Sequence, residues 1–135
     1  MFIAIDGDDV GRSLELYILD NRIEELEFFA TALKQKFEWF ANKLHHLFRA
    51  RIHMIGGDSI LASCESDLEI LKRLESLRHE FFQHEFPTLS IGIGDTPREA
   101  YLALKYAKLR GKNRLITFED INDEKTWNNS NLVKS

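Results

Sequence analysis

The sequence predicts an α+β fold in which a mostly antiparallel sheet is covered by helices. Short apolar runs typical of strands alternate along the chain with longer segments whose apolar residues recur every three or four positions. Two of the short runs flank Gly56-Gly57, a dipeptide typical of a tight hairpin turn because glycine tolerates positive φ. The length of 135 residues, of which 44% are hydrophobic, is sufficient for one domain with a buried core.

The apolar pattern places the predicted elements in the order β-α-β-β-α-β-α-β. The predicted strands are residues 2–6, 51–55, 59–64, 89–93 and 114–118. A polar turn region is expected from the end of the first strand to about Asn21. The predicted helices are residues 23–47, residues 68–81 and a segment that begins at Thr96-Pro97 and ends at Gly111. The first six elements are those of a ferredoxin-like or palm fold, whose helices would cover one face of the sheet.

Local signals support the helix assignments. Thr96 is a favoured N-cap residue, Pro97 is favoured in the first turn, and Gly111 fits the position after the last turn. Residues 23–47 have a near-heptad spacing, but aromatic residues widen their apolar face. This favours a core helix, or a pair of helices with part of the face at a dimer interface, over an isolated coiled coil.

Composition and charge favour a small anionic ligand. The net charge of −4 argues against a general binder of DNA duplexes, whereas residues 98–114 hold six Lys and Arg residues and one acidic residue. The single cysteine, Cys64, cannot form an internal disulfide, which agrees with a reducing, cytoplasmic setting. No apolar run reaches the length of a membrane span and no basic leader precedes the first strand, so we expect no membrane partner. We expect a palm domain over residues 1–119 and a polar C-terminal tail over residues 120–135.

Two acidic turns follow directly on strand-like runs. Asp6-Gly7-Asp8-Asp9 follows the first predicted strand, and Gly56-Gly57-Asp58-Ser59 lies between the second and the third. Carboxylates at the ends of neighbouring strands repel each other unless a cation lies between them. Hard oxygen ligands of this kind suit Mg²⁺ or Mn²⁺, which take one or two carboxylates together with substrate phosphates. Each turn alone is more often an ordinary solvated turn, but together they predict a site for a metal-bound nucleoside triphosphate.

Each residue of the two turns has an expected part in that site. Asp6 ends the first strand, so its side chain can reach out of the sheet edge, and the Gly7 carbonyl can serve as a hard oxygen donor. Asp8 and Asp9 add charge, and at most one of them is expected to point with Asp6. Asp58 lies at the shoulder of the Gly-Gly turn. If the first three strands are adjacent, Asp6 and Asp58 meet over one pair of metal ions.

Lysine and serine residues outside the turns complete the predicted site. Lys105, Lys108 and Lys112 recur at three and four residues and share one helix face. We expect Lys105 to be solvated, whereas Lys108 and Lys112 lie near the helix end, where they can reach phosphates as point charges. Ser90 offers a hydroxyl among apolar residues, either as an ordinary strand residue or as a hydrogen-bonding partner for the edge of a nucleobase.

Four motifs occur in a fixed order along the chain. They are Asp-Gly-Asp-Asp-Val-Gly at 6–11, Gly-Gly-Asp-Ser at 56–59, Ser-Ile-Gly-Ile at 90–93 and Ala-Lys-x-x-Gly-Lys-Asn at 107–113. This set resembles the GGDEF and CRISPR palm superfamily, and the first motif is most similar to the cyclase palm in the large subunit of type III CRISPR complexes. A palm domain this short looks like the minimal CRISPR polymerase (mCpol) branch, and the resemblance covers about residues 1–118.

The resemblance implies a GGDEF-like palm that transfers nucleotidyl groups from nucleoside triphosphates, releases pyrophosphate and forms cyclic nucleotides. It implies Mg²⁺ or Mn²⁺ as cofactor, held by Asp6, Asp58 and the Gly7 carbonyl, with Asp8 and Asp9 as further catalytic acids. The residues expected to bind substrate are Gly7, Gly56, Gly57, Ser59, Ser90, Lys108 and Lys112, with Ser90 as the reader of adenine. The family is associated with antiviral defence beside a nucleotide-sensing effector. A homodimer with two facing sites would let each triphosphate be attacked by the ribose hydroxyl of the other.

Departures from the pattern of diguanylate cyclases bear on the substrate. The second acid of their hairpin motif is replaced by Ser59, a poor metal ligand, so Asp8 or Asp9 would have to compensate or turnover would be slow. Their Phe-Lys and Asn-Asp elements and their inhibitory Arg-x-x-Asp site are missing, which favours ATP and a cyclic di-AMP type of product over cyclic di-GMP. Two alternatives stay open: a degenerate palm that only binds nucleotide, and a phosphatase of the haloacid dehalogenase type, which also places Asp-x-Asp after its first strand.

Overall fold

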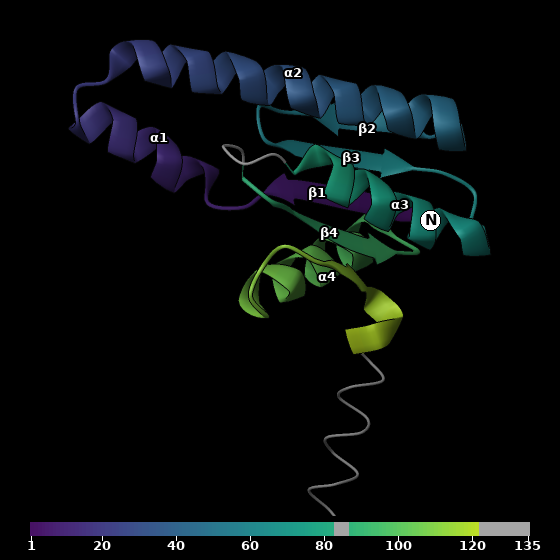
Figure 1. Ribbon diagram of the computed structural model, residues 1–135. Coiled ribbons are helices and arrows are strands. Elements are labelled where there is room, and N and C mark those ends of the chain that lie inside the picture. Colours follow the sequence, from purple (N-terminus) through teal and green to yellow (C-terminus); the bar gives the residue numbers. More distant parts are fainter. Residues whose placement is uncertain (83–86, 122–135) are drawn as a thin grey trace, which may run out of the picture.

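Five strands form one mostly antiparallel sheet in the computed structural model, which describes residues 1–82 and 87–121 (Figure 1). The strands are β1 (Phe2–Gly7), β2 (Arg51–Ile55), β3 (Ser59–Ser63), β4 (Leu89–Gly94) and β5 (Leu115–Thr117). The helices are α1 (Val10–Leu19), α2 (Ile23–Phe48), α3 (Leu68–Phe81) and α4 (Pro97–Leu109). The strand order is β2-β3-β1-β4-β5, and each neighbouring pair is antiparallel except β4 and β5. The predicted α+β class is therefore confirmed.

Helix α1 corrects the prediction of a polar turn region between β1 and residue 21. Val10 is buried, and Leu14 and Tyr17, four and seven residues further on, pack against the core. These positions share one face of a helix, although the residues between them are mostly polar. Asp9 precedes the helix with a φ of 58°, a left-handed conformation that turns the chain out of β1. The element order is therefore β-α-α-β-β-α-β-α-β, with α1 packed beside α2 (Figure 1).

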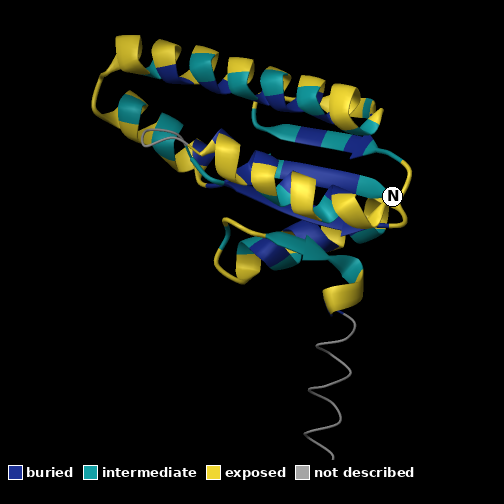
Figure 2. Ribbon diagram, turned by 45° about the vertical axis from the view of Figure 1, so that its right-hand side comes forward, coloured by how far each residue is buried: buried dark blue, intermediate teal, exposed yellow. Residues whose placement is uncertain are grey.

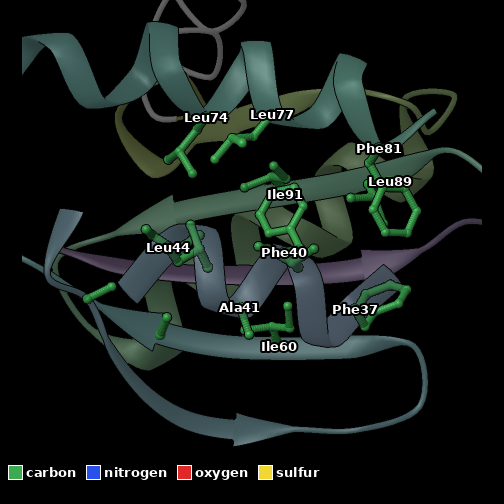
Figure 3. Close-up of a cluster of buried hydrophobic side chains, with 14 of the residues drawn as sticks. Phe37, Phe40, Ala41, Leu44, Ile60, Leu74, Leu77, Phe81, Leu89 and Ile91 are labelled. Atoms are coloured by element: carbon green, nitrogen blue, oxygen red, sulfur yellow. The ribbon is translucent and has the colours of Figure 1, made fainter. Parts of the chain in front are cut away.

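The main core lies between one face of the sheet and the helices α2 and α3 (Figure 3). Phe37 and Phe40 of α2 are fully buried, and their ring centroids lie 5.2 and 6.1 Å from that of Phe81 in α3. Each such side chain contributes about 1.5–3 kcal/mol through burial. The residues of α2 that face this core recur at three- and four-residue spacing, while its opposite side is exposed (Figure 2). The prediction of a core helix over residues 23–47 is therefore confirmed.

Helix α4 packs on the opposite face of the sheet, which corrects the expectation that helices cover one face only. Ala100 and Leu104 of α4 pack against Ala4 of β1, whose side chain points away from the main core. The approach is close because β4 carries glycine at two positions under the helix. A Cβ added at Gly92 would lie 2.2 Å from the Ala100 carbonyl oxygen, and one at Gly94 would lie 2.7 Å from the Ala100 nitrogen. Glycine at these positions thus lets α4 rest directly on β4.

The ends of α4 agree with the sequence signals, whereas the hairpin turn differs from them. The Thr96 side chain accepts a hydrogen bond from a first-turn N–H, and Gly111 follows the helix with a φ of 115°. Gly111 is the only glycine with a positive φ among residues 1–82 and 87–121. The β2–β3 turn is closed instead by the Gly56 N–H, which donates to the Ser59 carbonyl at 2.8 Å. The predicted hairpin therefore forms, without a positive φ at Gly56 or Gly57.

The C-terminal region is described only at its start. The predicted polar tail begins at residue 120, but its second residue, Ile121, is buried. Residues 122–135 lie outside the described part of the chain, and with them the rest of that prediction. No helix in the described ranges combines the length and apolar character of a membrane span.

Candidate active site

The two acidic turns lie side by side at one edge of the sheet. The central strand β1 pairs with β3, so that Asp6 faces Ser59 across the ladder. One residue further on, the Gly7 N–H donates to the Asp58 carbonyl at 2.8 Å. A Cβ added at Gly7 would lie 3.7 Å from the Asp58 Cβ. Strand pairing thus brings the two turns into direct contact.

Lys108, in the last turn of α4, reaches into this edge. Its ammonium lies 3.0 Å from Asp6 Oδ2 and 2.7 Å from Asp8 Oδ1, and it donates to the Gly7 carbonyl at 2.8 Å. The Lys108 side chain is only 23% exposed, so these interactions are screened less than those of a surface ion pair. Three oxygen atoms of the first acidic turn therefore surround one cation.

Asp8 is a buried carboxylate held by four donors, and it is only 3% exposed. Its Oδ1 accepts hydrogen bonds from the Lys108 ammonium and the Ser90 hydroxyl, both at 2.7 Å. Its Oδ2 accepts from the Thr88 hydroxyl at 2.6 Å and from the Asn113 N–H at 2.9 Å. Burial alone would raise the pKa of Asp8, but these four hydrogen bonds outweigh it and hold the pKa below its ordinary value. The ionised carboxylate thereby ties β1 to β4, α4 and the following loop.

This network changes the expected parts of Asp8 and Ser90. Because both oxygens of Asp8 already accept two hydrogen bonds, the carboxylate is not placed to compensate for the neutral Ser59 as a metal ligand. Ser90 is fully buried and donates to Asp8, so its hydroxyl does not face a nucleobase as predicted. Both residues position Lys108. Thr88 was missed by sequence reasoning, since a threonine that leads into a strand has no distinctive pattern.

The loop after α4 supplies a backbone donor to this carboxylate and places Lys112. Gly111, Lys112 and Asn113 have φ angles of 115°, 64° and 51°, all in the left-handed region. The Arg78 guanidinium of α3 donates to the Asn113 side-chain oxygen at 2.5 Å and thus fixes the loop. The Lys112 ammonium pairs with the exposed Asp9 carboxylate. The sequence analysis placed Asn113 in a motif but gave it no role, because a contact made by its backbone N–H requires no particular side chain. It did not single out Arg78, which is distant in the sequence from the loop it contacts.

Asp6 and Asp58 form the less saturated part of the edge. The Asp6 side chain is 34% exposed and accepts a hydrogen bond from Lys108. Burial raises the pKa of Asp6, and the negative charges of Asp58 and Asp8 add to the rise, whereas Lys108 offsets only part of it. The approach of a further cation would stabilise the ionised form of such a carboxylate.

The donor set suits a hard divalent cation that binds together with its substrate. The carboxylates of Asp6 and Asp58 and the carbonyl of Gly7 are oxygen ligands of the kind that Mg²⁺ and Mn²⁺ prefer. The position of the Lys108 ammonium indicates that this edge attracts positive charge. Over the described ranges, no three His, Cys, Asp or Glu residues are grouped closely enough to hold a metal by themselves. An ion at this edge would take further ligands from water or from the phosphate oxygens of a nucleotide.

The hairpin residues predicted to bind substrate lie at accessible positions. A Cβ added at Gly57 would meet no atom within 4 Å, so the tip of the turn has free space around it. Gly56 is likewise exposed. Ser59 lines the same groove as Asp6 and Lys108, on the α4 side of the sheet. The structure thus leaves these residues accessible to a ligand, and their binding role stays a prediction.

The family model of the minimal CRISPR polymerase domain, mCpol, matches residues 2–118. The chain belongs to the mCpol family. The match covers both acidic turns and Lys108, and it confirms the resemblance found in the sequence. No curated protein sequence matches the chain.

A solved structure supports the fold of the mCpol domain. The chain is similar to the GGDEF domain of DgcB from Caulobacter crescentus, solved in complex with c-di-GMP. The two share 15% sequence identity and superpose with a TM-score of 0.58, and the match covers 87% of this chain and 77% of that chain. At this identity the likeness shows a shared palm-like fold. Family and fold together make this mCpol chain a palm domain of the nucleotide cyclase or polymerase type.

Proposed function

We propose that the chain is a metal-dependent nucleotidyltransferase that converts ATP into a cyclic nucleotide second messenger of the cyclic di-AMP type, with release of pyrophosphate. The observation that carries this proposal is the meeting of Asp6, Asp58 and Lys108 at the edge of an mCpol palm. Nucleotidyl transfer needs acids that hold divalent cations and a positive charge that positions phosphate, and this edge supplies both kinds of group.

Asp6 and Asp58 would hold Mg²⁺ or Mn²⁺, assisted by the Gly7 carbonyl. When bound, the ions would lower the pKa of the attacking ribose hydroxyl and neutralise charge on the leaving pyrophosphate. The raised pKa of Asp6 supports this assignment, since the carboxylate is under-compensated by Lys108 alone. Asp8 would not bind the ions itself but would position the ligands, because its four hydrogen bonds keep the end of β1 in place.

Lys108 would orient the phosphates of the bound nucleotide. Its ammonium is held from the buried side by Asp8, and its contact with Asp6 lies toward the more exposed side. A phosphate oxygen could take the place of Asp6 at Lys108 while Asp8 keeps the ammonium in position. Lys112 would add a second positive charge from the neighbouring loop, where its partner Asp9 is 52% exposed.

Adenine and a role in defence are part of the proposal. The bound c-di-GMP is a property of the DgcB domain, whereas this chain lacks the Phe-Lys, Asn-Asp and Arg-x-x-Asp elements of diguanylate cyclases. ATP is therefore the favoured substrate. In this proposal the product acts in the cytoplasm on a nucleotide-sensing effector as part of antiviral defence, which the mCpol family membership supports.

We also propose that two copies act together as a homodimer. Two facing palms would let the ribose hydroxyl of each nucleotide attack the activated phosphate held by the other. Large apolar side chains are exposed where α1 meets α2, and such surfaces mark interaction sites. Leu19, Ile23 and Phe28 there are 76%, 60% and 72% exposed. Substitution of Leu19→Glu should therefore convert a dimer to a monomer in analytical ultracentrifugation; an unchanged mass would reject this surface.

The activity is tested by incubating the protein with each nucleoside triphosphate and Mg²⁺ or Mn²⁺ and identifying the products by mass. We expect a cyclic dinucleotide and pyrophosphate from ATP. Asp58→Asn should lower product formation about 100-fold or more, whereas Glu69→Gln, an exposed change on α3, should leave it unchanged. Orthophosphate as the product would instead support a phosphatase, and ATP binding without any product would support a degenerate palm.

A further inference from the structure

A groove of about 690 Å³ runs along α4 from the acidic edge, on the sheet face opposite the main core. Asp6 and Lys108 lie at one end, and the groove continues past Tyr101 to Arg98 at the start of the helix. Its lining includes Leu61 of β3 and is mostly apolar. This volume lies within the range of about 300–1,000 Å³ that is usual for small-molecule sites.

The groove exists because α4 lies to one side of this sheet face. The glycines of β4 draw the helix onto that strand, and α4 packs against β4, β1 and β5. The strands β2 and β3 extend beyond it, and Met54 of β2, which also lines the groove, is 55% exposed. Part of the sheet face therefore stays accessible directly beside the acidic edge.

One stripe of α4 forms the wall of the groove. Arg98, Tyr101, Lys105 and Lys108 follow one another at three- and four-residue spacing and so share a face. The stripe is about 15 Å long, since ten residues of helix rise 1.5 Å each. Tyr101 is 53% exposed, and the Lys105 ammonium lies 5.3 Å from the centre of its ring. The wall therefore combines three positive charges with one accessible aromatic ring.

We propose that this groove binds the nucleoside part of the triphosphate whose phosphates lie at Asp6 and Lys108, with the base stacked on Tyr101. The inference rests on the proposed function. An accessible aromatic ring beside an apolar floor suits the flat face of a base. The positive wall and the phosphate-binding lysine at its end favour an anionic nucleotide over an apolar peptide or a lipid chain. Arg98 would donate hydrogen bonds to acceptor atoms on the edge of the base.

The test compares two ligands on the same variants by isothermal titration calorimetry with Mg²⁺. The first ligand is ATP with a methylene group between its α and β phosphorus atoms, which cannot undergo nucleotidyl transfer, and the second is inorganic triphosphate. Tyr101→Ala should weaken the binding of the ATP analogue about tenfold or more. It should leave the affinity for inorganic triphosphate unchanged, because that ligand has no base.

Two control variants separate stacking from a loss of fold. Tyr101→Phe keeps the ring and should bind the ATP analogue within about twofold of wild type. Leu109→Ala changes an exposed residue of the same helix outside the groove, and it should have no effect on either ligand. Equal weakening of both ligands by Tyr101→Ala would overturn the assignment of the base to this groove.

The outcomes distinguish failure of the groove assignment from failure of the proposed function. If wild-type protein forms product and Tyr101→Ala binds the analogue as wild type does, the groove assignment fails and the proposed function stands. If wild-type protein binds the analogue through Tyr101 but forms no product, the proposed function fails and the groove remains a nucleotide site. If wild-type protein binds neither ligand, both are rejected.

Discussion

Asp6 and Asp8 lie two residues apart in one turn, yet their surroundings are opposite. Asp8 is buried and accepts four hydrogen bonds that hold its pKa below the ordinary value. Asp6 is partly exposed, and burial together with the charges of Asp58 and Asp8 raises its pKa despite Lys108. The comparison separates a carboxylate that holds the structure from one whose charge is left for a ligand to compensate. The substitutions below test this difference between the two carboxylates, in order from the largest expected effect on stability to the smallest.

The largest effect is expected from removal of the saturated carboxylate. Asp8→Ala should lower the free energy of unfolding by about 3–5 kcal/mol, because four donors lose a buried acceptor and Lys108 loses its inner partner. Urea unfolding in the presence of a metal chelator measures the change. Asp9→Asn in the same turn removes only an exposed ion pair and keeps a residue type that tolerates the left-handed φ of Asp9, so it should cost no more than about 1 kcal/mol. Equal effects of the two substitutions would contradict the distinction.

An intermediate effect is expected from Ser90, which supports Asp8 from β4. Ser90→Ala should cost about 1–3 kcal/mol, since it leaves a buried carboxylate oxygen with one donor fewer. As a positioning residue it should lower kcat for ATP and leave KM unchanged. Ser76→Ala removes an exposed hydroxyl of α3 and serves as the matched control. It should change the free energy of unfolding by no more than about 0.5 kcal/mol. A raised KM with full stability would instead restore the predicted contact between Ser90 and the base.

The pH dependence of stability should differ between the two acids. The folded-state pKa of Asp8 is lowered, so its stabilising contribution is complete above the ordinary carboxyl pKa of 3.8 and disappears as the pH falls through the folded-state value. The difference in unfolding free energy between wild type and Asp8→Ala should therefore be largest near neutral pH and shrink below about pH 4. Chemical unfolding with metal chelated, repeated from pH 7 to pH 3, measures it. A difference independent of pH would show that Asp8 acts through packing alone.

The smallest effect on stability is expected from Asp6. Its folded-state pKa is raised, so any stabilisation it provides is present below pH 3.8 and is lost as the pH rises through the folded-state value. Asp6→Asn at pH 7 without metal should therefore leave Tm unchanged or raise it. A fall in Tm as large as that of Asp8→Ala would mean that the ion pair with Lys108 is the dominant interaction of Asp6.

The fold was largely predictable from apolar spacing, and the errors of that prediction have physical causes. The core helices and the strands β1, β3 and β4 were found because they carry regularly placed buried residues. Strand β2 has no buried residue and was found from its position beside Gly56-Gly57. Helix α1 was missed because Val10 is its only fully buried residue, so its apolar face is too short to stand out in a polar segment. The position of α4 on the second face depends on Gly92, whose missing side chain is an absence that periodicity does not register.

The residues of the site were predictable from the sequence, but the role of each residue was not. The acidic turns and Lys108 were found because their spacing places them at one sheet edge. Which carboxylate of the first turn points inward depends on the left-handed φ of Asp9 and on the loop that presents the Asn113 N–H. Both are backbone features with no required side chain, so Asp8 and Ser90 were predicted to meet substrate although they meet each other.

The central claim is that the charge of Asp6 serves catalysis and not the fold. The most direct test measures the product of the Asp6→Asn protein with ATP and Mg²⁺ alongside its unfolding free energy. Our account predicts that cyclic dinucleotide formation is lost while the free energy of unfolding in chelator is at least that of wild type. Product formation at the wild-type rate, or loss of product that coincides with loss of the folded state, would contradict it.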